Sequence, residues 1–259
     1  MITVHLCRSG IQMTKREMYV NQISPIASNR KKLESFLVTH SNLPGPRANL
    51  ELLFALSATY EDHQVLTEWL AIAESQEDGT TPRSFLPMCA AACLGKLYVK
   101  RNDRRIIEQL RCTANDNRWR VREGVAFGLQ FIGEDNFNAL KEIVNLWLYS
   151  SSNREKRAIL AGLAHPPILD NDAAAFCLAT TDQILHTMDR TSDFEILRKG
   201  LDYAISVFAT ASPEAGFRFI EQRIGDDTVL NRIMRENLRK NRLMKINPSE
   251  VRRLLDLIR

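Results

Sequence analysis

A pair of helical segments recurs about every 35 residues along this chain, and this repeat constrains its fold more than any other feature. The first helix of each pair is predicted to begin near Arg47, Arg83, Arg118, Asn153, Phe194 and Val229. The second helix follows after a short break, near Asp62, Asp103, Asp135, Asp172, Pro213 and Pro248. Because one two-helix unit is too small to bury its apolar face alone, adjacent units must stack on each other. The sequence therefore predicts an all-α fold, an α-α superhelix (solenoid) of about six helical hairpins.

Apolar residues in the predicted helices recur at the spacing of one helix face. Val121, Val125 and Leu129, for example, follow the i, i+4, i+8 pattern. Phe127 lies off this stripe, so that helix has more than one apolar face and is expected to lie between two neighbours. No segment alternates apolar and polar residues with the Val, Ile and Thr content of a strand, so no strand is predicted.

The repeat also sets the expected domain organisation. Residues 47–259 are predicted to form one elongated repeat domain, and residues 1–46 an N-terminal extension with a first helix. No helical periodicity is evident before Met18, so Met18 and Met1 are both candidates for the natural start of the chain.

Composition excludes several classes of protein. The chain is 44% hydrophobic and 25% charged, which is too apolar for a disordered protein. No stretch approaches the roughly 18 uncharged apolar residues of a membrane helix, and no secretory signal is recognised near the N-terminus. The five cysteines form an odd set without a CxxC pair, so reduced thiols are expected. These features predict a cytoplasmic protein with no membrane segment.

Two segments resemble the first helices of HEAT-type and armadillo-type repeats. They are residues 118–126 (RWRVREGVA) and residues 154–160 (REKRAIL), and the segment from Asp227 to Leu238 is similar. The resemblance covers about residues 47–259, although its repeat motif is degenerate. It implies a curved solenoid in which the second helices usually line the concave side. The chain is also similar to bacterial HEAT-like proteins of unknown role.

A narrower resemblance is to the HEAT-like-repeat DNA glycosylases, which excise alkylated purines. That family places a Trp and a carboxylate one turn apart on one helix, and an Arg before an Ala-Ile-Leu run in the next repeat. Trp119, Glu123 and Arg157 stand in these places, with Glu where the family has Asp. The resemblance implies an aromatic face beside a cationic base, a carboxylate that stabilises oxocarbenium charge and an Arg that grips phosphate. The alternative is that the Trp packs in the core and the other two side chains are polar contacts between repeats.

Positive charge gathers at two separated places along the chain. One group falls between positions 100 and 122, and the other is spaced to form a single stripe down one helix. Guanidinium groups suit phosphates, so both groups are candidates for binding a nucleic-acid backbone or another anionic partner. The alternative is that they are solvated helix faces. The candidates are Lys100, Arg101, Arg104, Arg105, Arg111, Arg118, Arg120 and Arg122, and then Arg232, Arg235, Arg239 and Arg242.

Motifs for His-based, nucleotide-driven or metal-dependent catalysis are absent from the sequence. It holds no GxSxG elbow, no phosphate-binding GxxxxGKS/T loop and no HExxH. Cys89 and Cys93 lie four apart on an apolar helix without further ligands at useful spacing, so buried thiols are expected rather than a metal site. No cofactor or metal is predicted.

These observations together predict a non-catalytic binding scaffold. Its groove would hold a macromolecular partner, either a protein or a nucleic-acid backbone. The alternative function is a DNA glycosylase-like enzyme that acts on alkylated purines through Trp119, Glu123 and Arg157.

Overall fold

The structure, a computed structural model, describes residues 13–73 and 81–258 of the chain. Within these ranges the chain forms α-helices and three short 3-10 helices but no strand, so the prediction of an all-α fold is confirmed. None of the described helices is long and apolar enough to cross a membrane. The α-helices are α1 (Lys15–Ile23), α2 (Arg30–Thr39), α3 (Leu50–Thr59), α4 (His63–Leu70), α5 (Phe85–Arg101), α6 (Arg104–Thr113), α7 (Trp119–Asp135), α8 (Phe137–Leu148), α9 (Asn153–Leu163), α10 (Asn171–Thr187), α11 (Phe194–Ala211), α12 (Pro213–Glu221), α13 (Thr228–Leu238), α14 (Asn241–Ile246) and α15 (Pro248–Leu257).

Most helices begin at a side chain that accepts a hydrogen bond from a free backbone N–H of the first turn. These capping residues are Thr14, Asn29, Asn49, Asp62, Asp103, Asn136, Ser152, Asp170, Asp227 and Asn247. Pro213 and Pro248 open α12 and α15, where the missing proline N–H leaves no bond unmade. Because local chemistry fixes these starts, every predicted helix start lies within three residues of an observed one.

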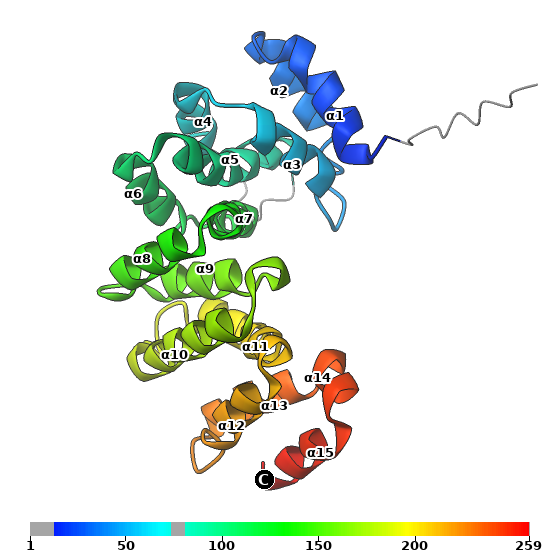
Figure 1. Cartoon of the computed structure of the whole chain (residues 1–259). Coiled ribbons are helices and arrows are strands. Elements are labelled where there is room, and N and C mark those ends of the chain that lie inside the picture. Colours follow the sequence, from blue (N-terminus) through cyan, green and yellow to red (C-terminus); the bar gives the residue numbers. More distant parts are fainter. Residues whose placement is uncertain (1–12, 74–80, 259) are drawn as a thin grey trace, which may run out of the picture.

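The first helices of the predicted pairs form one layer in which each helix contacts the next. Helix α3 packs on α5, α5 on α7, α7 on α9, α9 on α11 and α11 on α13. The second helices α4, α6, α8, α10 and α12 pack against this layer from one side. Figure 1 shows the result as a stack that follows chain order from cyan to orange. The buried apolar side chains of all these helices form one continuous core.

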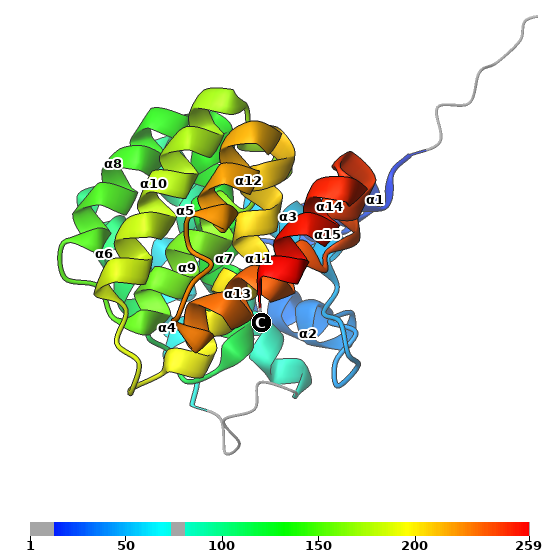
Figure 2. The same ribbon diagram turned by 90° about the horizontal axis from the view of Figure 1, so that it is seen from below.

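The helices at the two ends of the chain lie on the same side of the stack. Helix α1 packs on α3, and α14 and α15 follow α13. In both Figure 1 and Figure 2, α1, α14 and α15 project beyond the first-helix layer, away from α6, α8 and α10. The surface of the first-helix layer that points away from the second helices is called the inner face below. It is flanked at both ends by the terminal helices.

The start of the first helix differs from the sequence prediction. No helical pattern is evident before Met18, yet α1 begins at Lys15. The cause is a capping box, in which the side chain of Thr14 accepts from the N–H of Glu17 while the Glu17 carboxylate accepts from the N–H of Thr14. Residues 1–12 of the predicted extension lie outside the described residues.

The prediction of one arginine stripe near the C-terminus is wrong. Helix α13 ends at Leu238 and α14 begins only at Asn241, so no single helix carries the four arginines. Arg232 and Arg235 lie on α13, whereas Arg242 lies on α14 and points elsewhere. The break follows Arg239, where the helix closes on its last turn.

Candidate functional site

A hollow of 340 Å³ opens on the inner face between α7, α9 and α11. Small and apolar side chains form most of its wall, and its polar groups are Glu123, Gln130, Arg157, Lys199 and Tyr203. All of its lining residues lie on these three first helices or at the C-cap of α9. The hollow is therefore lined by first helices and not by second helices.

Glu123 and Arg157 form an ion pair at the wall of the hollow. The Arg157 guanidinium also donates to the backbone carbonyl of Arg122 at 3.3 Å. Both side chains of the pair are partly buried, at 33% and 17% exposed. The carboxylate is thus neutralised inside the chain, and it adds little negative field to the hollow.

Trp119 does not pack in the core, since 42% of it is exposed. It lies one turn before Glu123 on α7 but is not among the residues that line the hollow. The Arg120 guanidinium lies over the indole ring, 4.2 Å from its centroid. Arg120 itself is 3% exposed and donates to the carbonyl of Gly45 at 3.1 Å. Burial lowers the pKa of Arg120, and the buried guanidinium packs against one face of the indole.

Aromatic rings from α3 and α7 meet next to the hollow and carry cations on their faces. The Phe54 ring meets the rings of Phe127 and Phe131 edge-on, with centroids 5.3 and 5.8 Å apart. The Arg16 guanidinium lies 4.8 Å from the centroid of Phe54, and the Lys96 ammonium lies 4.8 Å from that of Phe131. Phe127 also lines the hollow, so the ring cluster and the hollow are continuous.

The same pairing of ring and cation recurs on the other side of the hollow. Tyr203 on α11 is 43% exposed, and the Arg242 guanidinium from α14 lies 4.6 Å from its ring centroid. Lys199, one turn before Tyr203, lines the hollow and is exposed. Arg242 on α14 therefore lies beside the hollow, apart from Arg232 and Arg235 on α13.

We call these cations and rings, in and around the hollow, the cation–aromatic strip. Two carboxylates pair with its cations: Glu51 with Arg16 at 3.4 Å, and Glu123 with Arg157. Lys96, Lys199 and Arg242 have no carboxylate partner among residues 13–73 and 81–258. The strip runs over Arg16, Phe54, Lys96, Phe131, Phe127, Trp119, Arg120, Arg157, Lys199, Tyr203 and Arg242.

Three arginines of the first predicted basic group bond to loops within the chain. Arg111 pairs with Glu155 at 3.1 Å and donates to the backbone carbonyls of Trp147 and Ser150, both at 3.2 Å. Arg118 pairs with Asp116 at 2.6 Å and donates to the carbonyls of Leu70 and Ile72. Arg122 donates to the carbonyls of Asp116 and Asn117 at 2.6 and 2.7 Å, and burial lowers its pKa. Arginines in such positions hold neighbouring helix pairs together.

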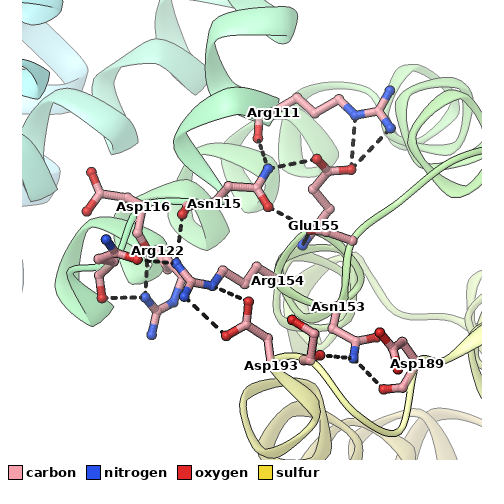
Figure 3. A network of polar contacts seen from close by, with 12 residues as sticks. Arg111, Asn115, Asp116, Arg122, Asn153, Arg154, Glu155, Asp189 and Asp193 are labelled. Carbon is pink, nitrogen blue, oxygen red and sulfur yellow. Dashed lines mark hydrogen bonds and ion pairs between the residues drawn. The ribbon is translucent and has the colours of Figure 1, made fainter.

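Figure 3 shows how this network continues from pair to pair. Arg154 donates to the carbonyl of Asn115 at 2.8 Å and pairs with Asp193 at 2.8 Å, so it joins the start of α9 to the loops before α7 and α11. Asn153 donates to the carbonyl of Asp189 at 2.6 Å. These contacts satisfy loop carbonyls that adjacent pairs would otherwise leave unpaired.

The remaining residues of the first basic group lie around α5 and α6. Lys100 pairs with Glu61, and Arg101 donates to the Glu61 carbonyl at 2.8 Å. Arg105 is paired with Asp103 at 2.7 Å, and its side chain is 89% exposed. Arg104 is exposed and lines a separate hollow between α5, α6 and α8. None of these four side chains belongs to the cation–aromatic strip, and their role in binding stays a prediction.

The arginines of α13 lie in a third place, between α13 and the start of α11. Arg232, Arg235 and Arg239 line a hollow of 540 Å³ there, together with Glu195 and Glu236. Arg235 donates to the Ile258 carbonyl at 3.3 Å, and Arg239 lies 3.4 Å from Glu236. The carboxylates reduce the positive potential of this hollow, whereas Arg242 lies apart on the strip.

The two thiols that were predicted to be buried, those of Cys89 and Cys93, lie in the core. Cys89 and Cys93 are fully buried, and burial raises the pKa of both, for Cys93 to about 12. Within the described ranges no group of three or more His, Cys, Asp or Glu side chains is placed to hold a metal ion.

Apart from Trp119, the aromatic residues of the strip were not predicted from the sequence. Phe54, Phe127 and Tyr203 come from three different helix pairs and form no motif along the chain. The one indication in the sequence is the off-stripe position of Phe127, which places an apolar residue on a second face of α7.

Family models, curated proteins and solved structures were compared with this chain, and none of them matches it.

Proposed function

We propose that this chain is a non-catalytic binding protein whose inner face holds a nucleic acid. In this proposal the stack is a solenoid of HEAT-like pairs, supported by the contact of each first helix with the next. The observation that carries the proposed function is the cation–aromatic strip, which runs from α1 across α5, α7, α9 and α11 to α14.

The cations of the strip suit a phosphate backbone because most of them rest on rings rather than on carboxylates. A cation over a ring keeps its charge and most of its N–H donors, while the ring fixes its position. Lys96, Lys199 and Arg242 are held in this way or line the hollow directly. They come from α5, α11 and α14, so they are spread along the stack, and a bound strand would have to follow the inner face to reach all three.

Salt dependence of binding tests this proposal. Neutralisation of about three phosphates by Lys96, Lys199 and Arg242 predicts a slope of log K against log salt of about −2 for a single strand and about −3 for a duplex. For a single strand the affinity then falls about 20-fold between 50 and 200 mM salt. Fluorescence anisotropy of a labelled oligonucleotide measures both values. Binding with no slope, or no binding at low salt, contradicts the proposal.

Charge reversal locates the contact. Lys199→Glu with Arg242→Glu is expected to lower the affinity at least about tenfold at 50 mM salt and to make the slope shallower, because two phosphate contacts are lost. The matched control is Lys141→Glu with Arg218→Glu, which reverses two charges on α8 and α12 in the second-helix layer. The control is expected to bind like the parent. Equal loss in both variants would show that the net charge of the protein, and not the strip, determines binding.

A glycosylase-like activity is the second candidate function. It is favoured by one observation, that Glu123 and Arg157 line a hollow one turn from the exposed Trp119. The ion pair nevertheless occupies the carboxylate that this chemistry needs. We therefore expect no release of alkylated purines from methylated DNA above background, measured by chromatography of free bases. Release by the parent that is abolished in Glu123→Gln would replace the binding proposal by the enzymatic one.

A further inference from the structure

Two aromatic rings of the strip are exposed, while the other two tryptophans of the chain are not. Trp119 is 42% exposed and Tyr203 is 43% exposed. Trp69 and Trp147 are both 0% exposed, so they belong to the core. Tyr149 is the opposite case: it is 94% exposed, but it follows α8 in the second-helix layer, away from the strip.

Each of the two rings has an arginine on one side and solvent on another. Arg120 beneath Trp119 is buried, so the exposed surface of the indole lies away from that guanidinium. The Arg242 guanidinium lies over the Tyr203 ring, 4.6 Å from its centroid, and Arg242 is partly exposed. At Tyr203 the π surface and the partly exposed Arg242 match the two parts of one nucleotide, a base and its phosphate.

The position of the two rings fits a strand that crosses the hollow. Trp119 lies on α7 and Tyr203 on α11, with α9 between them. Neighbouring packed helices lie about 8–10 Å apart, so the axes of α7 and α11 are roughly 16–20 Å apart, a distance that a few nucleotides can span. Lys199 and Arg157 lie in the hollow between the rings.

From this arrangement we propose that the inner face binds single-stranded nucleic acid, with unpaired bases stacked on Trp119 and Tyr203 and phosphates on Lys199 and Arg242. This inference rests on the proposed function and narrows its ligand class. A duplex offers only base edges and phosphates, because its base faces are stacked on each other. Exposed rings at both sides of the hollow therefore favour a strand whose bases are free.

Intrinsic fluorescence tests this inference directly, because Trp119 is the one exposed tryptophan of the three. The probes are an oligothymidylate of about 16 nucleotides and a duplex of equal length. Oligothymidylate is expected to quench the Trp119 emission at saturation and to bind more tightly than the duplex. Trp119→Ala is expected to weaken oligothymidylate binding by about 5-fold to 150-fold, and Tyr203→Ala by a similar factor.

Three variants separate stacking from effects on folding. Trp119→Phe keeps a ring and should retain most of the affinity, while Tyr149→Ala removes an exposed ring outside the strip and should bind like the parent. Unchanged emission at saturation, or a Trp119→Ala protein that binds oligothymidylate as the parent does, overturns the inference. If the duplex binds with the salt slope given above while emission stays constant, the stacking inference fails and the proposed function stands. If neither probe binds, both fail.

Discussion

Gly95→Ala is expected to destabilise the protein by about 3 kcal/mol, because it inserts a methyl group between two helix backbones. A Cβ at position 95 would lie 2.2 Å from the carbonyl oxygen and 2.4 Å from the Cα of Gly128. Backbone atoms cannot turn aside as a flexible side chain can, so α5 and α7 must move apart. These two helices make the most extensive contact in the stack. Urea denaturation of the parent and the variant measures the change in the free energy of unfolding.

The matched control for this change is Gly225→Ala. A Cβ at position 225 would meet nothing within 4 Å, and the loop that carries this residue lies before α13. Its stability should stay within about 0.5 kcal/mol of the parent. A Gly95→Ala protein as stable as the Gly225→Ala protein would show that α5 and α7 do not pack backbone to backbone, and the stack described above would then be incorrect.

Asn237→Leu is expected to cost about 3 kcal/mol, through lost hydrogen bonds rather than through overpacking. Asn237 on α13 is 0% exposed and connects α13 to α11. Its amide donates to the carbonyl of Leu201 at 2.8 Å, and its side-chain oxygen accepts from the N–H of Ser206 at 2.8 Å. Leucine has a similar size but satisfies neither group, so both lose a partner in an apolar environment.

Asn145→Leu provides the comparison, since Asn145 is exposed on α8. That change should leave the urea midpoint within the error of the measurement. Hydrogen exchange gives a second readout: in Asn237→Leu the amides of α11 and α13 should exchange faster, while those of α5 and α7 keep their protection. Uniform loss of protection over the whole chain, or none, would contradict the assignment of Asn237 as a local connection between these two helices.

The fold class followed from the sequence because it is encoded locally. Caps such as Asp62, Asp103 and Asn247 mark helix starts, and the apolar spacing marks the helices themselves. The break between α13 and α14 was missed because no Gly or Pro marks it: Arg239 and Lys240 are both compatible with a continuing helix. After the break α14 packs on α11, where Arg242 lies over Tyr203.

The candidate site could be predicted only in part. The sequence singled out Trp119, Glu123 and Arg157, and two of these residues do line one hollow. It also singled out basic residues by their density along the chain, although density does not distinguish a free cation from one bonded to a loop. Arg118 and Arg122 are occupied by backbone carbonyls, whereas Lys96 and Lys199, which were not among the candidate binding residues, lie on the strip.

Ultraviolet crosslinking of bound oligothymidylate, followed by mass spectrometry of the peptides, tests the central claim most directly. If the inner face is the binding surface, crosslinks fall on the peptides of α7 and α11 that contain Trp119 and Tyr203, with the segment around Lys199 next in yield. Crosslinks on α6 or α8 around Arg104 and Arg105, with none on α7 or α11, would instead place binding on the second-helix layer and contradict the claim.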